Sequence, residues 1–503
     1  MTDEWNRHLL PEEVVQAAPG PLGGVVRRGA LISGAAFAVV QIVSLIGTLA
    51  LARLLSPAEV GIFAAGTVLS VVLITLAEGG FRIALIQRVQ NVEDAANTVF
   101  WVTAAGGLVI SLATIAAAPV LGYIFRSDLV AAVAIASSGL LLLELLTTVP
   151  DGLMQRRFNF VRMVIEAFRA IVYAVVAVAF AASGFGVWSM VFGQYAAVAV
   201  WLLGSWSLAR WRPDRRPPTL RLWRELARFS HPVVIWDIVL YARETAQTAI
   251  IGRSLGPAAL GNYRYGTRMG TLPGVAVVQI GSYVLFPAFA RLVGDQPRLR
   301  DAFLRALRWI WLAAAPTAAL VVAVGQQAVV VLLGERWKEA GLLTVGLAGY
   351  GLGLALQEVL LAAILAFGRS AVFYWISALG LMVGLGLLIA LLPLGLVGVG
   401  LAVSLTEILI GVVLLVLAKP IVAYRFRTII KILAPPAIAA AVALVPVHLF
   451  GRVTGPISEQ STAIAVALLV AQSVVFVLCY VVALTILDYR LVASLIAKAR
   501  ARL

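Results

Sequence analysis

The chain has 503 residues, of which 62% are hydrophobic and only 13% are charged. Soluble domains are about half apolar and a quarter charged, so this composition excludes a soluble globular protein and indicates an integral membrane protein. The formal net charge of +15 would suit a nucleic-acid-binding protein. However, the basic residues gather on one predicted side of the membrane, so we expect no nucleic-acid partner.

The opening residues 1–28 are polar and acidic, lack the pattern of a cleavable signal peptide, and are expected to form a cytoplasmic tail. Apolar stretches of about 20 residues follow, each long enough to cross a bilayer as an α-helix. They predict an all-α integral membrane protein with about 14 transmembrane helices, which lie at 29–54, 59–83, 97–123, 129–149, 161–182, 186–208, 232–253, 260–286, 304–333, 340–366, 370–392, 395–417, 430–450 and 462–487.

The connections between these spans are short and differ in charge. Arginine-rich connections such as "ARWRPDRRPPTLRLWRELAR" alternate with connections that carry few basic residues. Basic connections stay on the cytoplasmic side, so both termini are predicted to be cytoplasmic. The short connections leave no room for a soluble catalytic domain.

Part of the sequence is duplicated. The segment "LARLLSPAEVGIFAAGTVL" at 51–69 returns as "IGRSLGPAALGNYRYGTRM" at 251–269, at a constant offset of 200. A second match relates "SGFGVWSM" to "PLGLVGVGLA" at an offset of 212. Six predicted spans separate the copies, so both copies would run in the same direction as parallel repeats. We therefore expect two six-helix lobes around a central cavity, with two further helices at the C-terminus.

This duplication sets the expected domain organisation. It consists of the tail 1–28, an N-lobe 29–209, a basic cytoplasmic linker 210–228, a C-lobe 229–418, and the last two helices with the C-terminus, 419–503. In each copy, a proline suits the first turn of a helix. The small residues that follow it are expected to let consecutive spans approach closely.

The two copies differ in charge at the start of the predicted eighth span. Ala64 and Val68 of the first copy correspond to Arg264 and Arg268 of the second, which lie one helical turn apart. An arginine in hydrocarbon costs about 2.5–3.5 kcal/mol and normally faces a cavity or a partner. Both arginines are therefore candidates for the cavity lining, although Arg264 lies close to the start of its span, a position that favours reaching the outer headgroups instead.

Other ionisable residues lie at membrane depth. The seventh span stacks Asp237, Tyr241, Glu244 and Thr248 on one face, with Arg243 beside them. The second span carries Glu78 and Arg82 at i and i+4, and the fifth carries Glu166 and Arg169 at i and i+3. Either pair could be a structural ion pair. Glu144 and Glu407 are lone carboxylates, expected to be hydrogen-bonded neutral groups or ion-coupling sites.

The usual signals of catalysis are absent from the sequence. It contains no Walker loop, no nucleophile elbow and no His or Cys cluster with metal-ligand spacing, so we predict no catalytic residues, no metal and no cofactor. The single cysteine, Cys479, is expected to be an inert thiol inside a span. An ion gradient or the membrane potential is the expected energy source.

Several segments resemble a known transporter family. In order and spacing, "LARLLSPAEVGIFAAG", "RIALIQR", "GFGVWSMVFGQ", "IIGRSLGPAALGNYRYGTRMGTLP" and "LLGERWKEAGLL" resemble the Wzx-type polysaccharide exporters of the MOP superfamily, in particular the subgroup that exports colanic or teichuronic acid units. The resemblance covers nearly all of residues 29–450. It implies a flippase that moves an undecaprenyl-diphosphate-linked oligosaccharide from the inner to the outer leaflet of the bacterial inner membrane. Membrane lipids, a polysaccharide polymerase and glycosyltransferases are the implied partners.

The resemblance also suggests roles for the candidate residues. The arginine of the family's "YR" element corresponds to Arg268, whereas Gln247 stands where members commonly place an acid. Because arginine grips phosphate oxygens through paired charge-assisted bonds, the diphosphate is expected to bind arginines, namely Arg268, Arg243, Arg82 and Arg264. The candidate ion-coupling carboxylates are Glu78, Asp237, Glu244 and Glu407.

Two other hypotheses remain open. A cation-coupled drug exporter of the same fold would use carboxylates such as Asp237, Glu244 and Glu407 to bind cationic compounds. A membrane-embedded polysaccharide polymerase or ligase would need a sizeable external loop, which the short connections disfavour.

Overall fold

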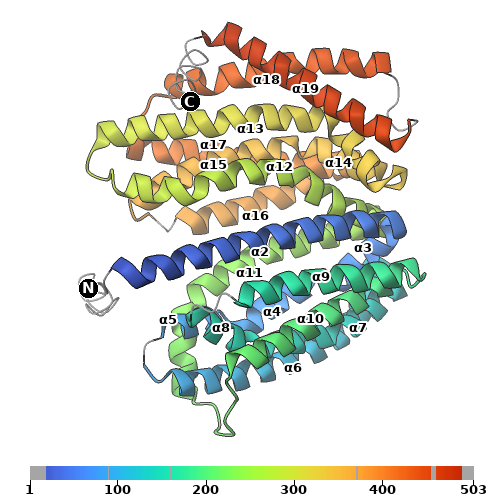
Figure 1. The fold of residues 1–503 in the computed structure, drawn as a ribbon, viewed down its shortest axis with the longest axis vertical. Helices are drawn as coiled ribbons and strands as arrows, with labels where there is room; N and C mark the ends of the chain where they lie inside the picture. Colours follow the sequence, from blue (N-terminus) through green and yellow to red (C-terminus); the bar gives the residue numbers. More distant parts are fainter. Residues whose placement is uncertain (1–18, 89, 158–160, 370–371, 455–459, 490–503) are drawn as a thin grey trace. The chain divides into compact units, whose positions relative to one another are not determined.

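The computed structural model describes residues 19–88, 90–157, 161–369, 372–454 and 460–489 (Figure 1). Within these ranges, every regular element is a helix, as the apolar stretches predict. The α-helices are α2 Pro19–Leu54, α3 Pro57–Gly66, α4 Ser70–Glu78, α5 Phe81–Gln87, α6 Val92–Phe125, α7 Asp128–Leu145, α8 Thr148–Arg156, α9 Val161–Ala182, α10 Trp188–Ala209, α11 Leu220–Leu255, α12 Pro257–Ala290, α13 Gln296–Leu333, α14 Lys338–Gly346, α15 Ala348–Ala366, α16 Val372–Leu391, α17 Gly395–Val422, α18 Phe426–Thr454 and α19 Thr462–Leu487.

Eleven segments of the described residues are long and apolar enough to cross a membrane. One of them, Val372–Val422, contains both α16 and α17, which are separated by the short 3-10 helix Leu392–Leu394. The predicted spans 232–253 and 260–286 form the helices α11 and α12. These two helices carry several charged residues and are not among the eleven segments.

Several helices differ in extent from the predicted spans. Helix α2 begins at Pro19, within the predicted tail, and the rest of that tail lies outside the described residues. Helix α11 begins at Leu220, so only residues 210–219 of the predicted linker are non-helical. A helix makes its backbone hydrogen bonds internally, so it can continue past the end of an apolar stretch.

The predicted second span is divided into α3, α4 and α5. Helix α3 starts at a capping box in which Ser56 and Glu59 exchange hydrogen bonds, and Thr67 follows its last residue. Gly79 and Gly80 separate α4 from α5 with φ angles of 57° and 66°. Glycine adopts such angles without a steric penalty, so the "GG" pair accounts for the second interruption.

The contacts divide the chain into two compact units, which are described separately. Unit 1 comprises residues 1–50, 77–111 and 139–231, and unit 2 comprises residues 51–76, 112–138 and 232–503. Each unit therefore combines distant parts of the sequence.

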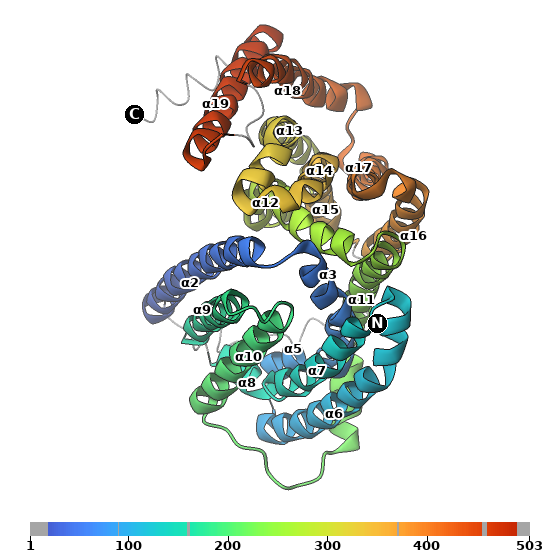
Figure 2. The same ribbon diagram turned by 90° about the vertical axis from the view of Figure 1, so that its right-hand side faces the viewer.

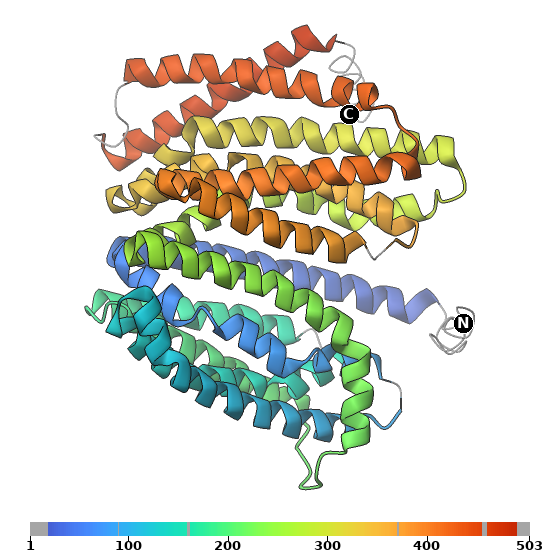
Figure 3. The same ribbon diagram turned by 180° about the vertical axis from the view of Figure 1, so that it is seen from behind.

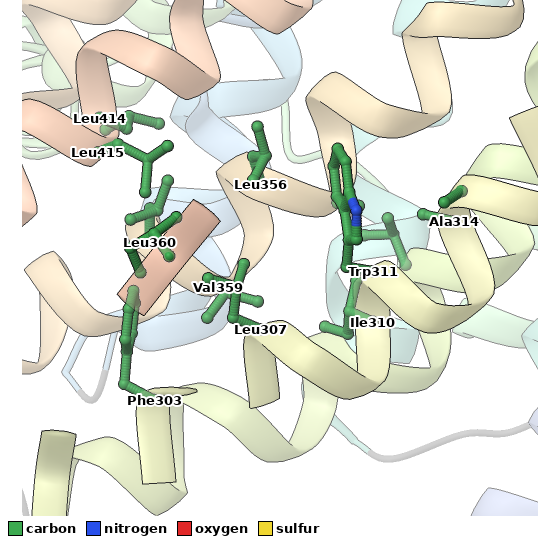
Figure 4. Close-up of a cluster of buried hydrophobic side chains, with 14 of the residues drawn as sticks. Phe303, Leu307, Ile310, Trp311, Ala314, Leu356, Val359, Leu360, Leu414 and Leu415 are labelled. Carbon is green, nitrogen blue, oxygen red and sulfur yellow. The ribbon is translucent and has the colours of Figure 1, made fainter. Parts of the chain in front are cut away.

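Unit 2 contains the largest buried core. One buried cluster contains Phe303, Leu307 and Trp311 of α13, Val359 of α15 and Leu414 of α17 (Figure 4). Helices α12, α13, α14 and α15 lie together (Figure 2), and α17 packs along α15 and α16 (Figure 3). Helices α18 and α19 pack against each other and against α13.

The core of unit 1 lies where α5 and α8 meet. It includes Phe81, Leu85 and Leu153, which are all buried. Beside it, the segment that leads into α11 is fastened to α6, because Asn97 bonds to the carbonyl oxygen of Arg216 and to the amide of Asp214. The predicted basic linker is therefore held by specific hydrogen bonds in unit 1.

The duplicated residues make matched contacts inside unit 2. Pro57 and Pro257 each occupy the first turn of a helix, as predicted. A Cβ atom on Gly61 would lie 1.8 Å from the carbonyl oxygen of Pro257, and one on Gly261 would lie 1.9 Å from the carbonyl oxygen of Pro57. For these two glycines, the close partner is thus the other copy and not the preceding span. Helices α3 and α12 cross at a point where only glycine fits.

A second pair of duplicated glycines has a different role. A Cβ atom on Gly66 would lie 2.6 Å from the side chain of Val133 in α7, and one on Gly266 would lie 2.6 Å from the carbonyl oxygen of Ala340 in α14. Each glycine therefore lets its own copy pack closely on a later helix of the same copy.

Candidate functional site

The most buried ion pair among the candidate residues joins α11 to α17. Nη1 of Arg243 lies 3.4 Å from Oε1 of Glu407, and the two side chains are 23% and 8% exposed. Gln357 of α15 donates Nε2 to the other carboxylate oxygen of Glu407 at 2.9 Å and to its backbone carbonyl oxygen at 3.0 Å. The prediction that Glu407 is a lone carboxylate is therefore wrong, because tertiary packing supplies two partners.

Glu407 is held firmly in place. Gly353 lies one turn before Gln357 on α15, and a Cβ atom on it would lie 2.4 Å from the carbonyl carbon of Glu407. Helices α15 and α17 therefore touch through their backbones at this point. Tyr350, on the same helix, lies within electrostatic range of both Glu407 and Arg243.

Arg243 is held less firmly than Glu407. Its side chain lies against two glycines of α16, where a Cβ atom on Gly380 would be 3.4 Å from Nη1 and one on Gly384 would be 4.0 Å from Cδ. Its Nε is buried and has no hydrogen-bond partner among the described residues. A guanidinium has five N–H donors, and at least the buried Nε donor of Arg243 has no acceptor among the described residues.

The other candidate residues of unit 2 lie on α11 and α12. The side chains of Arg264, Arg268 and Glu244 are exposed, and that of Asp237 is partly exposed. Cζ of Arg264 lies 5.6 Å from the centre of the Phe63 ring, so this arginine stacks on the first copy of the repeat. Within the described residues, Asp237, Glu244 and Arg264 have no ion-pair partner.

The candidate pair of unit 1 belongs to a larger network. Nε of Arg82 lies 3.0 Å from Oε1 of Glu78, as their spacing predicts. Nη1 of Arg82 also lies 3.1 Å from Oδ2 of Asp151, whose side chain is only 3% exposed. The other oxygen of Asp151 bonds to Arg162. Asp151 therefore bridges two guanidinium groups at the start of α8.

A second ion pair of unit 1 corrects a prediction. Arg169 pairs with Glu144, with Nη1–Oε1 and Nη2–Oε2 distances of 3.0 and 3.2 Å, and not with Glu166 on its own helix. Two parallel bonds are geometrically better than a contact along one helix. Glu144 is therefore not a lone carboxylate. Trp201 lies 5.7 Å from Cζ of Arg169 and fixes its own ring by donating to Thr147.

A double-mutant cycle can test this pairing. The variants Glu144→Gln and Arg169→Gln should show a coupling energy of about 1–2 kcal/mol, because the pair is bidentate and mostly buried. The matched cycle of Glu166→Gln with Arg169→Gln should give less than about 0.5 kcal/mol. Thermal unfolding in detergent provides both values. Equal coupling energies in the two cycles would contradict the assignment.

Sequence reasoning missed Asp151, Arg162 and Gln357. Asp151 follows the predicted span 129–149 in "TTVPDGLM" and so seemed to belong to a connection, and Arg162 is only the second residue of the next predicted span. The described residues contain no group of three or more His, Cys, Asp or Glu side chains that could hold a metal ion.

Long apolar helices with ion pairs between them define a multi-pass, all-helical membrane protein that keeps charge inside its bundles. A family model described as "Polysaccharide biosynthesis protein" matches residues 50–341, which is more than half of the chain. The chain belongs to this family, as a Wzx-like member of the MOP superfamily. The family is one of transporters and not of enzymes.

Curated relatives are similar in sequence over about two thirds of the chain. The succinoglycan biosynthesis transport protein ExoT of Rhizobium meliloti is 27% identical over 65% of this chain and 66% of its own length. The teichuronic acid biosynthesis protein TuaB of Bacillus subtilis is 26% identical over 62% of this chain and 65% of its own length. The lipopolysaccharide biosynthesis protein WzxC of Escherichia coli is 23% identical over 62% of this chain and 64% of its own length. The chain thus spans just under two thirds of each relative.

Solved structures show the same fold. The lipid II flippase MurJ, in an inward closed conformation, matches with a TM-score of 0.73 at 13% identity, over 92% of this chain and 100% of that one. An inward-facing multidrug resistance MATE family transporter of the MOP superfamily matches with a TM-score of 0.61 at 13% identity. The match covers 76% of this chain and 94% of that one. The protein therefore has a MurJ/MATE-like fold.

Proposed function

We propose that this protein is a flippase that moves an undecaprenyl-diphosphate-linked oligosaccharide from the inner to the outer leaflet of a bacterial inner membrane. The product would serve surface or exopolysaccharide synthesis. The observation that carries the proposal is Arg243, a partly buried cation whose Nε donor has no acceptor among the described residues of a chain of this family. A diphosphate supplies several acceptor oxygens, and a guanidinium binds two of them at once.

The proposed topology has fourteen crossings. Dividing the segment 372–422 into α16 and α17, and adding α11 and α12 to the candidate spans, gives the fourteen predicted helices. They would form an N-lobe 29–209 and a C-lobe 229–418 as parallel repeats around a central cavity, with the last two helices outside. Both termini would be cytoplasmic, since this topology keeps the arginine-rich connections inside.

The proposed mechanism is alternating access. The sugar and diphosphate cannot enter hydrocarbon unaided, so they would occupy the cavity while the lipid tail stays in the bilayer. Arg82, Arg243, Arg264 and Arg268 would bind the diphosphate. A coupling cation would bind to carboxylates and alternate with the diphosphate. The candidate carboxylates are Glu78, Asp237, Glu244 and Glu407. An ion gradient or the membrane potential would drive the cycle.

The contacts of Glu407 suggest how Arg243 exchanges partners. Gln357 and the backbone contact at Gly353 fix Glu407 on α17, so Arg243 is the partner that can move. A diphosphate oxygen would replace the carboxylate on Arg243, and Gln357 would continue to satisfy Glu407. The 3.4 Å separation of the two charges is longer than a typical charge-assisted bond, which favours such an exchange.

The proposed partners follow from the cargo. Glycosyltransferases would assemble the lipid-linked oligosaccharide on the cytoplasmic face, and a polymerase would consume it on the other face. Membrane lipids would surround the apolar helices, and neither a cofactor nor a nucleic acid takes part.

Deleting the gene and analysing membrane lipids tests the proposal. We expect a lipid-linked oligosaccharide to accumulate on the inner leaflet and the exported polysaccharide to disappear, with both effects reversed by the wild-type gene. An unchanged lipid profile would contradict the proposed function. Altered resistance to cationic drugs with unchanged lipids would instead favour the drug-exporter hypothesis.

A further inference from the structure

Two arginines at the same position of the repeat make the same contact in unit 2. Arg53 donates to the carbonyl oxygens of Val331 at 2.7 Å and Leu332 at 3.3 Å, close to the last residue of α13. Arg253 donates to the carbonyl oxygens of Tyr123 at 3.0 Å and Ile124 at 3.2 Å, close to the last residue of α6. In both cases, the acceptors stand second and third from the end of the helix.

The contacts are reciprocal between the two copies. Arg53 belongs to the first copy and caps a helix of the second, whereas Arg253 belongs to the second copy and caps a helix of the first. The last carbonyl groups of a helix lack internal donors and carry partial negative charge, so a cation there is favourable. Gly61 and Gly261 cross beside these caps, with no room for a side chain. We call Arg53, Arg253, Gly61 and Gly261 the clasp.

Further contacts close the same end of unit 2. Trp337 is fully buried, donates Nε1 to the carbonyl oxygen of Ala52 at 2.8 Å and stacks on Tyr265. Nη1 of Arg336 lies 3.4 Å from the carbonyl oxygen of Leu55. Leu55 is only 1% exposed, so these contacts seal it from its surroundings.

We infer that the clasp is the outer gate of the transport pathway and must separate when the cargo leaves. This inference rests on the proposed function, whose topology places the connection after the first span on the side of the membrane opposite the cytoplasm. Each contact is weak or easily broken: the caps are partly exposed hydrogen bonds, and the crossing is a contact between backbones. Two copies that meet through matched, reversible contacts can part without unfolding either copy.

Cysteine labelling tests this gate without any cargo. Leu55→Cys in a Cys479→Ala background serves as the reporter, and a membrane-impermeant maleimide is added to right-side-out and inside-out vesicles. We expect Arg53→Ala/Arg253→Ala to raise the labelling rate from outside about fivefold or more, because each cap shifts an equilibrium by up to about fivefold. Gly61→Ala should also raise the labelling rate from outside, because the added Cβ atom forces the two copies apart. Arg452→Ala, which removes an exposed arginine, is the matched control and should leave the labelling rate unchanged.

Two results would overturn the inference. One is an unchanged labelling rate from outside in both the double-arginine and the Gly61→Ala variants. The other is faster labelling only in inside-out vesicles, which would place the clasp on the cytoplasmic side. If the double variant is not recovered folded, Arg53→Ala and Arg253→Ala alone should each give a smaller increase. Because the assay contains no lipid-linked oligosaccharide, its failure would leave the proposed cargo untouched.

Discussion

Replacing Asp151 with alanine should lower the free energy of unfolding by about 3 kcal/mol. The substitution leaves two guanidinium groups, those of Arg82 and Arg162, without the carboxylate that joins them. Removing one member of a buried ion pair typically costs about 3–5 kcal/mol, and the lower end applies because Arg82 is 39% exposed. Denaturant or thermal unfolding in detergent, with fluorescence or size exclusion as readout, provides the measurement.

Two further variants provide comparisons for the effect of Asp151→Ala. Asp151→Asn keeps the shape of the side chain and one acceptor oxygen. It should therefore lower the free energy of unfolding less than Asp151→Ala does. Asp301→Ala removes an aspartate that is 60% exposed and 3.9 Å from Arg300, and should cost less than about 1 kcal/mol. If Asp151→Ala lowers the free energy of unfolding no more than Asp301→Ala does, then the network does not stabilise unit 1.

Replacing Arg243 with alanine should reduce export at least about tenfold at equal amounts of folded protein, since two charge-assisted bonds to the cargo would be lost. Arg243→Lys should restore only part of the activity, because an ammonium group cannot bind two phosphate oxygens side by side. The leaflet distribution of the lipid-linked oligosaccharide, compared with that of the wild type, is the measurement.

The controls for Arg243 separate binding from folding. Arg427→Ala removes an exposed arginine at the start of α18 and should export normally. Glu407→Gln keeps the shape of the side chain that Gln357 holds and removes the charge that competes for Arg243. Full export by Arg243→Ala at normal protein levels would refute the assignment of this residue to the diphosphate.

Local sequence was sufficient to predict most helices and the internal duplication. Apolar stretches predict helices because a backbone in hydrocarbon must satisfy its own hydrogen bonds. The break at Gly79 and Gly80 was missed, although the "GG" pair signals it. In α11, the charged residues lower the apolar signal, and the helix extends beyond the predicted span at its start.

The partners of the charged residues could not be predicted from local spacing alone. Glu78 and Arg82 pair as their spacing predicts, because they are neighbours on one stretch of chain. Arg169 has an acid three residues away but bonds to Glu144, and Arg243 bonds to a residue 164 positions later. These choices depend on which helices pack together. The sequence placed Arg243 on a predicted span among other charged residues, but it did not show which helix supplies its partner.

The crossing of α3 and α12 has a consequence for how the two copies diverged. It corresponds to an isologous contact of a two-fold dimer, now fused within one polypeptide. The contact uses main-chain atoms and the absence of side chains, so it requires glycine at positions 61 and 261. At matched positions further along the chain, the two copies differ, with Ala64 and Val68 in the first and Arg264 and Arg268 in the second. The symmetric contact is therefore compatible with two copies that differ in charge.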